Sequence, residues 1–136
     1  MNLIKVSSVI LFLISMNLNG QNLIGYSEKE IRQYMTDNQK NMKFQNFINN
    51  STFKYLKYSD NDETVTALFF MNDQLLCKSV RYICDKSLKT AKTKELNTLY
   101  KKVSDNEWVE IKNGKNYKID MKEDEWSFNV SITIKE

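Results

Sequence analysis

The chain has 136 residues, no histidine, no proline and a formal net charge of +3 at pH 7. Without histidine, it contains no Ser-His or Cys-His nucleophile and no metal site built on imidazole. The small positive charge gives no reason to expect a nucleic acid or an anionic membrane surface as a partner.

The beginning of the chain has the pattern of a secretory signal peptide. Lys5 precedes an apolar run at residues 6–16, and the small residue Gly20 follows it. The run is shorter than the roughly 20 residues that a membrane helix needs, so an uncleaved anchor is the less favoured alternative. No cysteine suited to lipoprotein processing follows the run. We therefore expect residues 1–20 to be a cleaved signal peptide, residues 21–136 to form a single domain, and the protein to be periplasmic or extracellular, with no stable membrane span after cleavage.

A capping box marks the start of the first predicted helix. Ser27 and Glu30 have the spacing at which each side chain bonds the backbone N–H of the other residue. Tyr26 and Ile31 flank the box as a hydrophobic staple, and apolar residues then recur at helical spacing. We therefore predict a helix that begins near Ser27 and ends, without a clear stop signal, between residues 39 and 43.

The chain after this helix is predicted to be mainly β structure. Residues 44–48 form either an extension of the helix or a short first strand, and we favour the strand. Between Phe53 and Tyr58 the apolar alternation changes phase, which suggests a bulge. Residues 65–71 alternate with a period of two, and Asn72-Asp73 suits a two-residue turn into a strand that starts at residue 74.

A long amphipathic helix is predicted to follow that strand directly. Asp85 suits the N-cap, because its carboxylate accepts hydrogen bonds from the free amides of the first turn. Lys92 and Glu95 project toward the apolar arc, so we expect the helix to lie on a sheet rather than to be buried on all sides. The apolar arc that extends the predicted helix to residue 103 consists of Leu88, Ala91, Leu96, Leu99 and Val103.

Three strands are predicted after this helix, and the first covers residues 107–112. Val109 and Ile111 share one face of it. If that face is buried, Trp108 lies on the opposite, wet face, where it would anchor a partner or cover a sheet edge.

The other two strands are joined by polar residues and preceded by the strongest hairpin signal of the chain, Asn113-Gly114. The last strand, residues 126–134, alternates apolar and polar side chains along its whole length. This alternation predicts that Trp126 and Phe128 lie in the core.

The predicted order is a helix, three or four strands, a second helix and three strands. It indicates an α+β fold of two layers, with an antiparallel sheet or sheets and the helices on one face. This order resembles that of β-lactamase-inhibitor-protein-like domains. Further similarity lies in four short stretches: Leu18-Asn19-Gly20-Gln21, Ser79-Val80-Arg81, Glu95-Leu96-Asn97 and Glu107-Trp108-Val109. In these the chain resembles small exported proteins of unknown function from Bacteroidota, which implies export and no particular activity.

The two cysteines are expected to be free, structural thiols. Cys77 and Cys84 are seven residues apart and fall on one predicted strand. At about 3.3 Å per residue they would lie roughly 23 Å apart on opposite faces, too far for a disulfide. The chain has no histidine to activate either thiol as a nucleophile.

Two groups of carboxylates were weighed as sites, and neither is favoured. A charged hairpin tip explains Glu123, Asp124 and Glu125 better than general acid/base catalysis does. The second group lies in a predicted turn between two strands. A solvated turn explains it better than a calcium site does, because the glycine and the distal glutamate of an EF-hand loop are missing. That second group is Asp60, Asp62 and Glu63. We therefore assign no catalytic, cofactor-binding or metal site and expect no cofactor.

The favoured function is that of an exported, non-enzymatic interaction module for an unknown protein or envelope component. Inhibitor-type or immunity-type binding is one version of this function. One alternative is a carrier that encloses a small apolar ligand between helix and sheet, and another is an enzyme that uses carboxylates or a thiol. A cavity lined by tyrosine and methionine would favour the carrier, a flat wet face rimmed by aromatic side chains the interaction module, and a cleft of converging carboxylates the enzyme.

Overall fold

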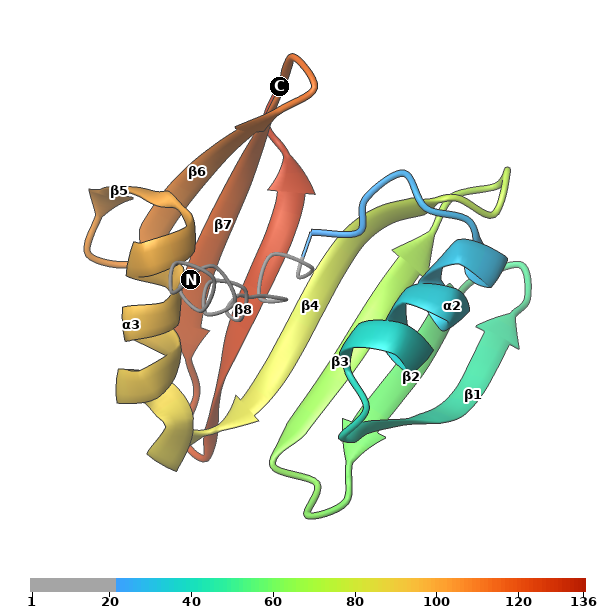
Figure 1. Cartoon of the computed structure of the whole chain (residues 1–136), viewed down its shortest axis with the longest axis horizontal. Helices are drawn as coiled ribbons and strands as arrows, with labels where there is room; N and C mark the ends of the chain where they lie inside the picture. Colours follow the sequence, from blue (N-terminus) through green and yellow to red (C-terminus); the bar gives the residue numbers. More distant parts are fainter. Residues whose placement is uncertain (1–21) are drawn as a thin grey trace, which may run out of the picture.

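A computed structural model describes residues 22–136, so the predicted signal peptide at residues 1–20 lies outside the described residues. Within them the chain forms a helix and four strands, then a second helix and four more strands (Figure 1). The elements of the first half are α2 (Glu28–Asn38), β1 (Met42–Asn49), β2 (Lys54–Asp60), β3 (Val65–Met71) and β4 (Cys77–Asp85). Those of the second half are a 3₁₀ turn (Lys86–Leu88), α3 (Lys89–Leu99), β5 (Lys101–Ser104), β6 (Glu107–Lys112), β7 (Lys115–Glu123) and β8 (Ser127–Ile134).

The strands form one antiparallel sheet in the order β1-β2-β3-β4-β8-β7-β6-β5. Each half is a meander of consecutive hairpins, and the two halves join where the last strand of one, β4, pairs with the last strand of the other, β8. The protein is therefore an α+β protein with an antiparallel sheet. The outer strands β1 and β5 form the two edges of this sheet.

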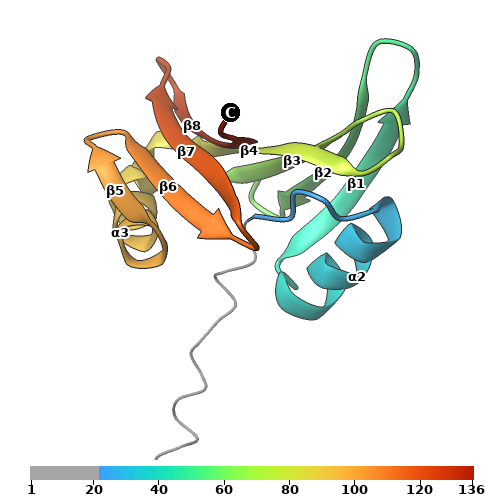
Figure 2. The ribbon, with the colours of Figure 1, turned by 90° about the horizontal axis from the view of Figure 1, so that it is seen from above.

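Both helices lie on the same side of the sheet (Figure 2). A segment at residues 22–27, here called the N-terminal strap, runs between them and crosses from one half to the other. On β4 it exchanges backbone hydrogen bonds with Cys77, through Gly25 N–H and the Tyr26 carbonyl, each 2.8 Å long. On β6 the Asn22 side chain donates to Glu110 Oε1 at 2.7 Å. Since Leu23 of the strap is also buried, this segment fastens the two halves to each other.

The hydrophobic core is continuous across the junction of the halves. One row of register partners on the helix side runs through Leu56, Phe69, Val80, Ile132, Ile119 and Trp108. Each of these side chains is at most 1% exposed. Ile31 of α2 and Leu96 of α3, both fully buried, join the same core. The helix side is therefore the dry face that a half-solvated antiparallel sheet requires.

The capping box that predicts the first helix is confirmed. Ser27 Oγ accepts from Glu30 N–H at 3.2 Å, and Glu30 Oε1 accepts from Ser27 N–H at 2.9 Å. The helix ends at Asn38, and the segment at residues 44–48 lies within strand β1, as favoured.

The second helix is shorter than predicted, and its last predicted turn is a strand. The chain becomes extended at Tyr100 (φ −131°, ψ 165°), and residues 101–104 form β5, which pairs with β6. Val103, predicted on the apolar arc, is 49% exposed. The second half therefore has four strands rather than three. Helical periodicity does not reveal this change, because the backbone groups of residues 101–104 are paired by a strand that comes later in the chain.

The bulge predicted between Phe53 and Tyr58 is not present in β2, which pairs with β3 without a shift. Phe53 precedes the strand, and within β2 Tyr55 lies on the open face while Leu56 and Tyr58 are buried on the other, so regular alternation accounts for the change of apolar phase. The register shift lies instead in β1, between Phe44 and Asn46.

The turn at Asn72-Asp73 is longer than the predicted two residues. Asn72 accepts from Leu75 N–H at 2.9 Å through its carbonyl, and its side-chain oxygen accepts from Leu76 N–H at 3.0 Å. Leu75 adopts a positive φ of 61° in this loop. Strand β4 therefore starts at Cys77 rather than at residue 74.

The two tryptophans are placed opposite to prediction. Trp108 is fully buried opposite Ile119, and its indole N–H donates to Asn97 Oδ1 of α3 at 2.9 Å. Ile111 takes the exposed face, with 75% of its surface accessible. Trp126 is 79% exposed because β8 begins one residue later, so the alternation of apolar residues extends beyond the strand.

Both cysteines are free thiols, as predicted, but they do not lie on opposite faces. Phe70 pairs with Ser79 while Met71 pairs with Cys77, so the register shifts at Lys78. This bulge turns Cys77 to the same side as Cys84, and both are buried in the core, at 2% and 1% exposed.

Candidate functional site

The carboxylates of the β7–β8 hairpin lie at its exposed end. Glu123 ends β7, and its Oε2 lies 3.0 Å from Lys89 Nζ at the start of α3. The hydrogen bond and the charge of Lys89 lower the pKa of the Glu123 carboxyl. A carboxylate that is held ionised and paired on the surface lacks the raised pKa of a general acid.

The carboxylate of Asp60 is used by the turn between β2 and β3. Burial is the largest single influence on its pKa and raises it, but the hydrogen bonds from the hydroxyl and N–H of Thr64 and from Val65 N–H together outweigh burial and lower the pKa. Asp62 and Glu63 do not converge with it on a metal site. Among residues 22–136, no group of three or more histidine, cysteine or acidic side chains is arranged to hold a metal ion.

The thiols of Cys77 and Cys84 are buried and protonated, so they are poor nucleophiles. Burial raises the pKa of the Cys77 thiol to about 12 and that of the Cys84 thiol to about 11. Both therefore stay protonated near neutral pH, and the thiolate is the reactive form.

The face of the sheet opposite the helices, here called the open face, carries no helix of the described chain (Figure 2). Ile48, Tyr55, Phe70 and Ser79 are consecutive register partners on it. The rings of Tyr55 and Phe70 lie 5.7 Å apart, and the Arg81 guanidinium is 5.5 Å from the Phe70 ring centroid. These three side chains, from β2, β3 and β4, are here called the aromatic cluster. A cation over the ring orients the arginine while it remains accessible.

The sign of the charge changes along one row of the open face, although Lys101, Lys118 and Lys122 also place cations on this face of the second half. One row of register partners runs across the whole sheet through Lys57, Leu68, Arg81, Ser131, Asp120 and Glu107. The first half contributes cations to this row and the second half carboxylates.

A hollow of about 400 Å³ adjoins the aromatic cluster. It lies between the β1–β2 loop and the β3–β4 loop, and Phe70 belongs to its lining. Phe53, 56% exposed, lines it from the loop before β2. Lys54 Nζ lies 3.5 Å from Asp73 Oδ1 across it, and Lys78 supplies a second cation. Aromatic and basic side chains therefore surround one end of the open face.

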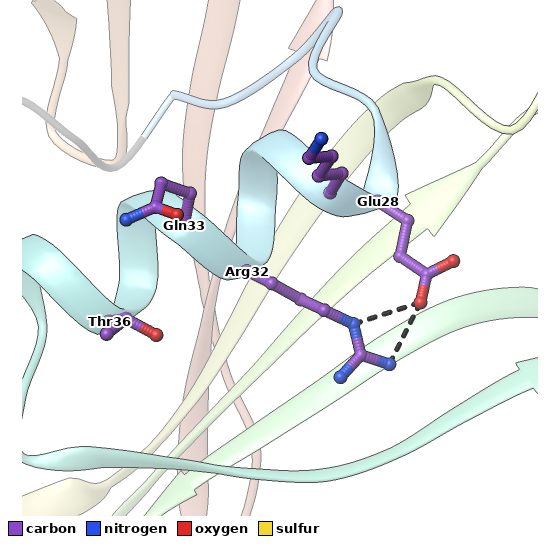
Figure 3. Close-up of a pocket in the computed structure, with 5 residues that line it drawn as sticks. Glu28, Arg32, Gln33 and Thr36 are labelled. Atoms are coloured by element: carbon purple, nitrogen blue, oxygen red, sulfur yellow. Dashed lines mark hydrogen bonds and ion pairs between the residues drawn. The ribbon is translucent and has the colours of Figure 1, made fainter.

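A further hollow, of about 410 Å³, lies along the outer surface of α2 (Figure 3). Its lining includes Glu28 and Arg32, joined by an ion pair in which both Arg32 Nε and Nη2 lie 2.9 Å from Glu28 Oε2. Figure 3 shows this pair extending away from the helix, while Gln33 points in another direction. The floor is formed by one helix surface only, so the hollow does not enclose a small molecule.

The fold and its surface thus define an α+β protein with one eight-stranded antiparallel sheet, one face of which is open. Comparisons with protein-family models, with curated proteins and with solved structures found no match for this chain. No relative therefore supplies a function or a site residue.

Sequence reasoning missed the aromatic cluster, although a signal for it exists. In residues 65–71, Ala67, Phe69 and Met71 face the core, and the residues between them would be expected to be polar. Leu68 and Phe70 are apolar instead, so this strand is apolar on both faces. The partners Tyr55 and Arg81 come from neighbouring strands, and only the register brings them to Phe70.

Proposed function

We propose that this protein is an exported, non-enzymatic interaction module, which binds another protein or an envelope component through its open face. The observation that carries the proposal is the aromatic cluster of Tyr55, Phe70 and Arg81 on a face with no helix over it. Aromatic residues and arginine are enriched among the residues that dominate binding energy at protein interfaces. Inhibition or neutralisation of the partner is one form that such binding takes.

The arrangement of the elements supports this use of the sheet. The helices and the sheet form two layers, and the helices stabilise the sheet from behind while leaving its outer side free. A continuous core through both halves holds the strands of this outer side in a fixed register. The rigid surface therefore loses little conformational entropy when a partner docks.

The packing between helices and sheet argues against the carrier. Phe69, Ile119 and Trp108 fill the helix side at 0% exposure. Two hollows lie on the outer surface and carry charged side chains. A third, between α2 and β1, has Met35, Met42 and Tyr58 in its lining, but Arg32, Lys40 and Lys43 also line it and it is not enclosed. A carrier for an apolar ligand needs an enclosed apolar cavity instead.

The state of the candidate nucleophiles argues against the enzyme. The thiols of Cys77 and Cys84 are buried and have raised pKa values, and the carboxylates of Asp60 and Glu123 are engaged in a turn and an ion pair. None of the three hollows described above is lined by any of these groups.

Export is part of the same proposal, and it rests on the pattern of Lys5, the apolar run and Gly20. The lack of a lipoprotein cysteine after the run favours a periplasmic or extracellular protein. No helix within residues 22–136 is long and apolar enough to cross a membrane. The mass of the protein recovered from the producing cell should correspond to a chain that begins within about two residues of Gln21. Recovery of the full-length chain in the membrane fraction would contradict export as a cleaved protein.

Affinity capture from an envelope extract of the producing cell tests the binding surface. The wild-type protein is compared with the double variant Tyr55→Ala/Arg81→Glu, which removes two of the three members of the aromatic cluster. Lys94→Glu, on the exposed side of α3, is the matched control. A partner retained by the wild type and the control and lost by the double variant supports the proposal. A partner that all three proteins retain equally refutes the open face as its binding site.

A further inference from the structure

The two edges of the sheet differ in their capacity to accept another strand. Strand β5 has four residues, and it begins with Lys101 and Lys102. Short, charged edges resist strand addition. Strand β1 has eight residues, with Lys43 as its one charged residue, and among the described strands it pairs only with β2. The β1 edge is therefore the long unpaired edge of the sheet.

The backbone of β1 offers hydrogen-bonding groups at this edge. Asn50 N–H donates to the Phe53 carbonyl at 2.9 Å and closes the hairpin between β1 and β2. Antiparallel partners alternate between bonded and non-bonded pairs. Since Asn50 forms a bonded pair with Phe53, Ile48 is the next bonded residue of β1, and Asn49 and Phe47 are the non-bonded ones. The N–H and C=O groups of Phe47 and Asn49 therefore point away from β2. These groups are placed to pair with an added strand.

A hollow of about 480 Å³ lies between α2 and the start of β1. Phe44 and Tyr58 line it, with their ring centroids 5.6 Å apart. The Arg32 guanidinium lies over Phe44, 3.9 Å from the ring centroid, and the Glu28 carboxylate holds it there. The hollow thus combines an aromatic wall with a fixed cation directly beside the β1 edge.

The charge around this hollow selects the occupant. Glu28 balances Arg32, while Lys40 and Lys43, both exposed, add two further cations to the lining. In a two-fold pair of copies at this edge the two β1 strands would run antiparallel, so Lys40 and Lys43 of each copy would lie at opposite ends of the pair and would gain no opposite charge. The carboxylates of an acidic segment would be attracted by Lys40 and Lys43.

We propose that β1 is the docking edge for an extended, acidic segment of a partner protein. The segment pairs with β1 as an additional strand, and one of its carboxylates enters the hollow between α2 and β1. Backbone pairing provides affinity and the hollow provides the preference for an acid, as in other cases of strand addition. This surface is separate from the open face and does not depend on the function proposed for it.

Synthetic peptides test the proposal on the purified protein. The first probe is an eight-residue, end-blocked peptide of alternating glutamate and valine, and the second has lysine in place of glutamate. The third keeps the glutamates but has proline in place of two valines, so it cannot pair along its length. Binding of fluorescently labelled peptides is measured by polarisation at low salt. The acidic β-forming peptide is expected to bind at least tenfold more tightly than each of the other two.

Variants of the protein locate the site. Lys40→Glu/Lys43→Glu should weaken the binding of the acidic peptide at least tenfold, and Asn49→Pro should weaken it by blocking the edge backbone. The control Lys86→Glu/Lys94→Glu, which changes the same charge on the second half, should leave the affinity within twofold. Circular dichroism of each variant establishes that the fold is retained.

Three results would overturn the proposal. Equal affinity for the acidic and proline-containing peptides would show attraction by charge without strand pairing. Binding that survives both the charge reversal and Asn49→Pro would place the peptide elsewhere. A dimer of the wild-type protein in light scattering that Asn49→Pro converts to a monomer would show that a second copy occupies the edge.

Discussion

The buried Trp108 gives a quantitative test of how α3 is fixed to the sheet. Its side chain is fully buried on β6, and its indole N–H donates to Asn97 Oδ1 of α3 at 2.9 Å. In Trp108→Phe the smaller ring leaves unfilled space worth about 1–2 kcal/mol, and loss of the hydrogen bond adds about 1 kcal/mol. The total of about 2–3 kcal/mol is a large fraction of the roughly 5–15 kcal/mol that stabilises a typical domain.

Urea unfolding followed by circular dichroism measures this loss for Trp108→Phe, for Asn97→Ala and for the double variant. Asn97→Ala should cost about 1 kcal/mol, because it removes the acceptor and leaves the buried indole N–H without it. The double variant should be more stable than the sum of the single effects predicts, by about 1 kcal/mol. Additive effects, or an unchanged unfolding midpoint for Trp108→Phe, would refute the placement of Trp108 between β6 and α3.

Four further predictions follow from the packing and the pKa values. Phe128→Ala should lower the free energy of unfolding by about 3–5 kcal/mol in urea titrations, because the ring is fully buried; a loss below 1 kcal/mol would contradict that burial. Alkylation at pH 8 should leave Cys77 and Cys84 unmodified in the folded protein and should label both after unfolding, since burial holds their pKa values at about 12 and about 11; a mass two units low without labelling would instead reveal a disulfide. Tyr100→Phe should raise the midpoint of thermal unfolding, because the buried hydroxyl of Tyr100 has no hydrogen-bond partner among residues 22–136 and its removal relieves a cost of about 1 kcal/mol; a lower midpoint would show that the hydroxyl is bonded. Asp60→Asn should destabilise the fold more at pH 7 than at pH 3, since a carboxyl with a lowered pKa contributes stability above its unfolded pKa and loses it as the pH falls through its folded pKa; an equal loss at both pH values would exclude this carboxylate as the cause.

Local signals predicted the local structure of this protein well. The capping box of Ser27 and Glu30 predicts the start of α2, because both partners of its hydrogen bonds lie within one turn. Asn113-Gly114 predicts the β6–β7 hairpin, since the positive φ values of 54° and 77° at these two residues are those that the turn requires. Both features depend only on residues near each other in sequence.

Long-range pairing accounts for the errors. Residues 101–104 continue a helical pattern, yet they pair with β6, which is formed by the residues that follow them. The bulge at Lys78 turns Cys77 to the side of Cys84, and only the pairing with β3 shows it. The faces of Trp108 and Trp126 depend on where β6 and β8 begin, and alternation alone does not fix those positions.

The candidate surfaces were harder to predict than the elements. The aromatic cluster and the β1 edge are made by the order of strands in the sheet, which brings together side chains from separate hairpins. The sequence does indicate that histidine-based chemistry is to be set aside, because the lack of histidine is visible without a structure. The position of an open face becomes visible only when both helices are seen on the same side of the sheet (Figure 2).

Oxidative footprinting of the captured complex tests the central claim most directly. Hydroxyl radicals modify aromatic side chains in proportion to their exposure, so the method compares the half-buried Tyr55 and Phe70 on the open face with Trp126, which is 79% exposed at the β7–β8 hairpin. The account predicts that the partner protects Tyr55 and Phe70 and leaves Trp126 as reactive as in the free protein. Protection of Trp126 with no change at Tyr55 and Phe70 would contradict binding through the open face.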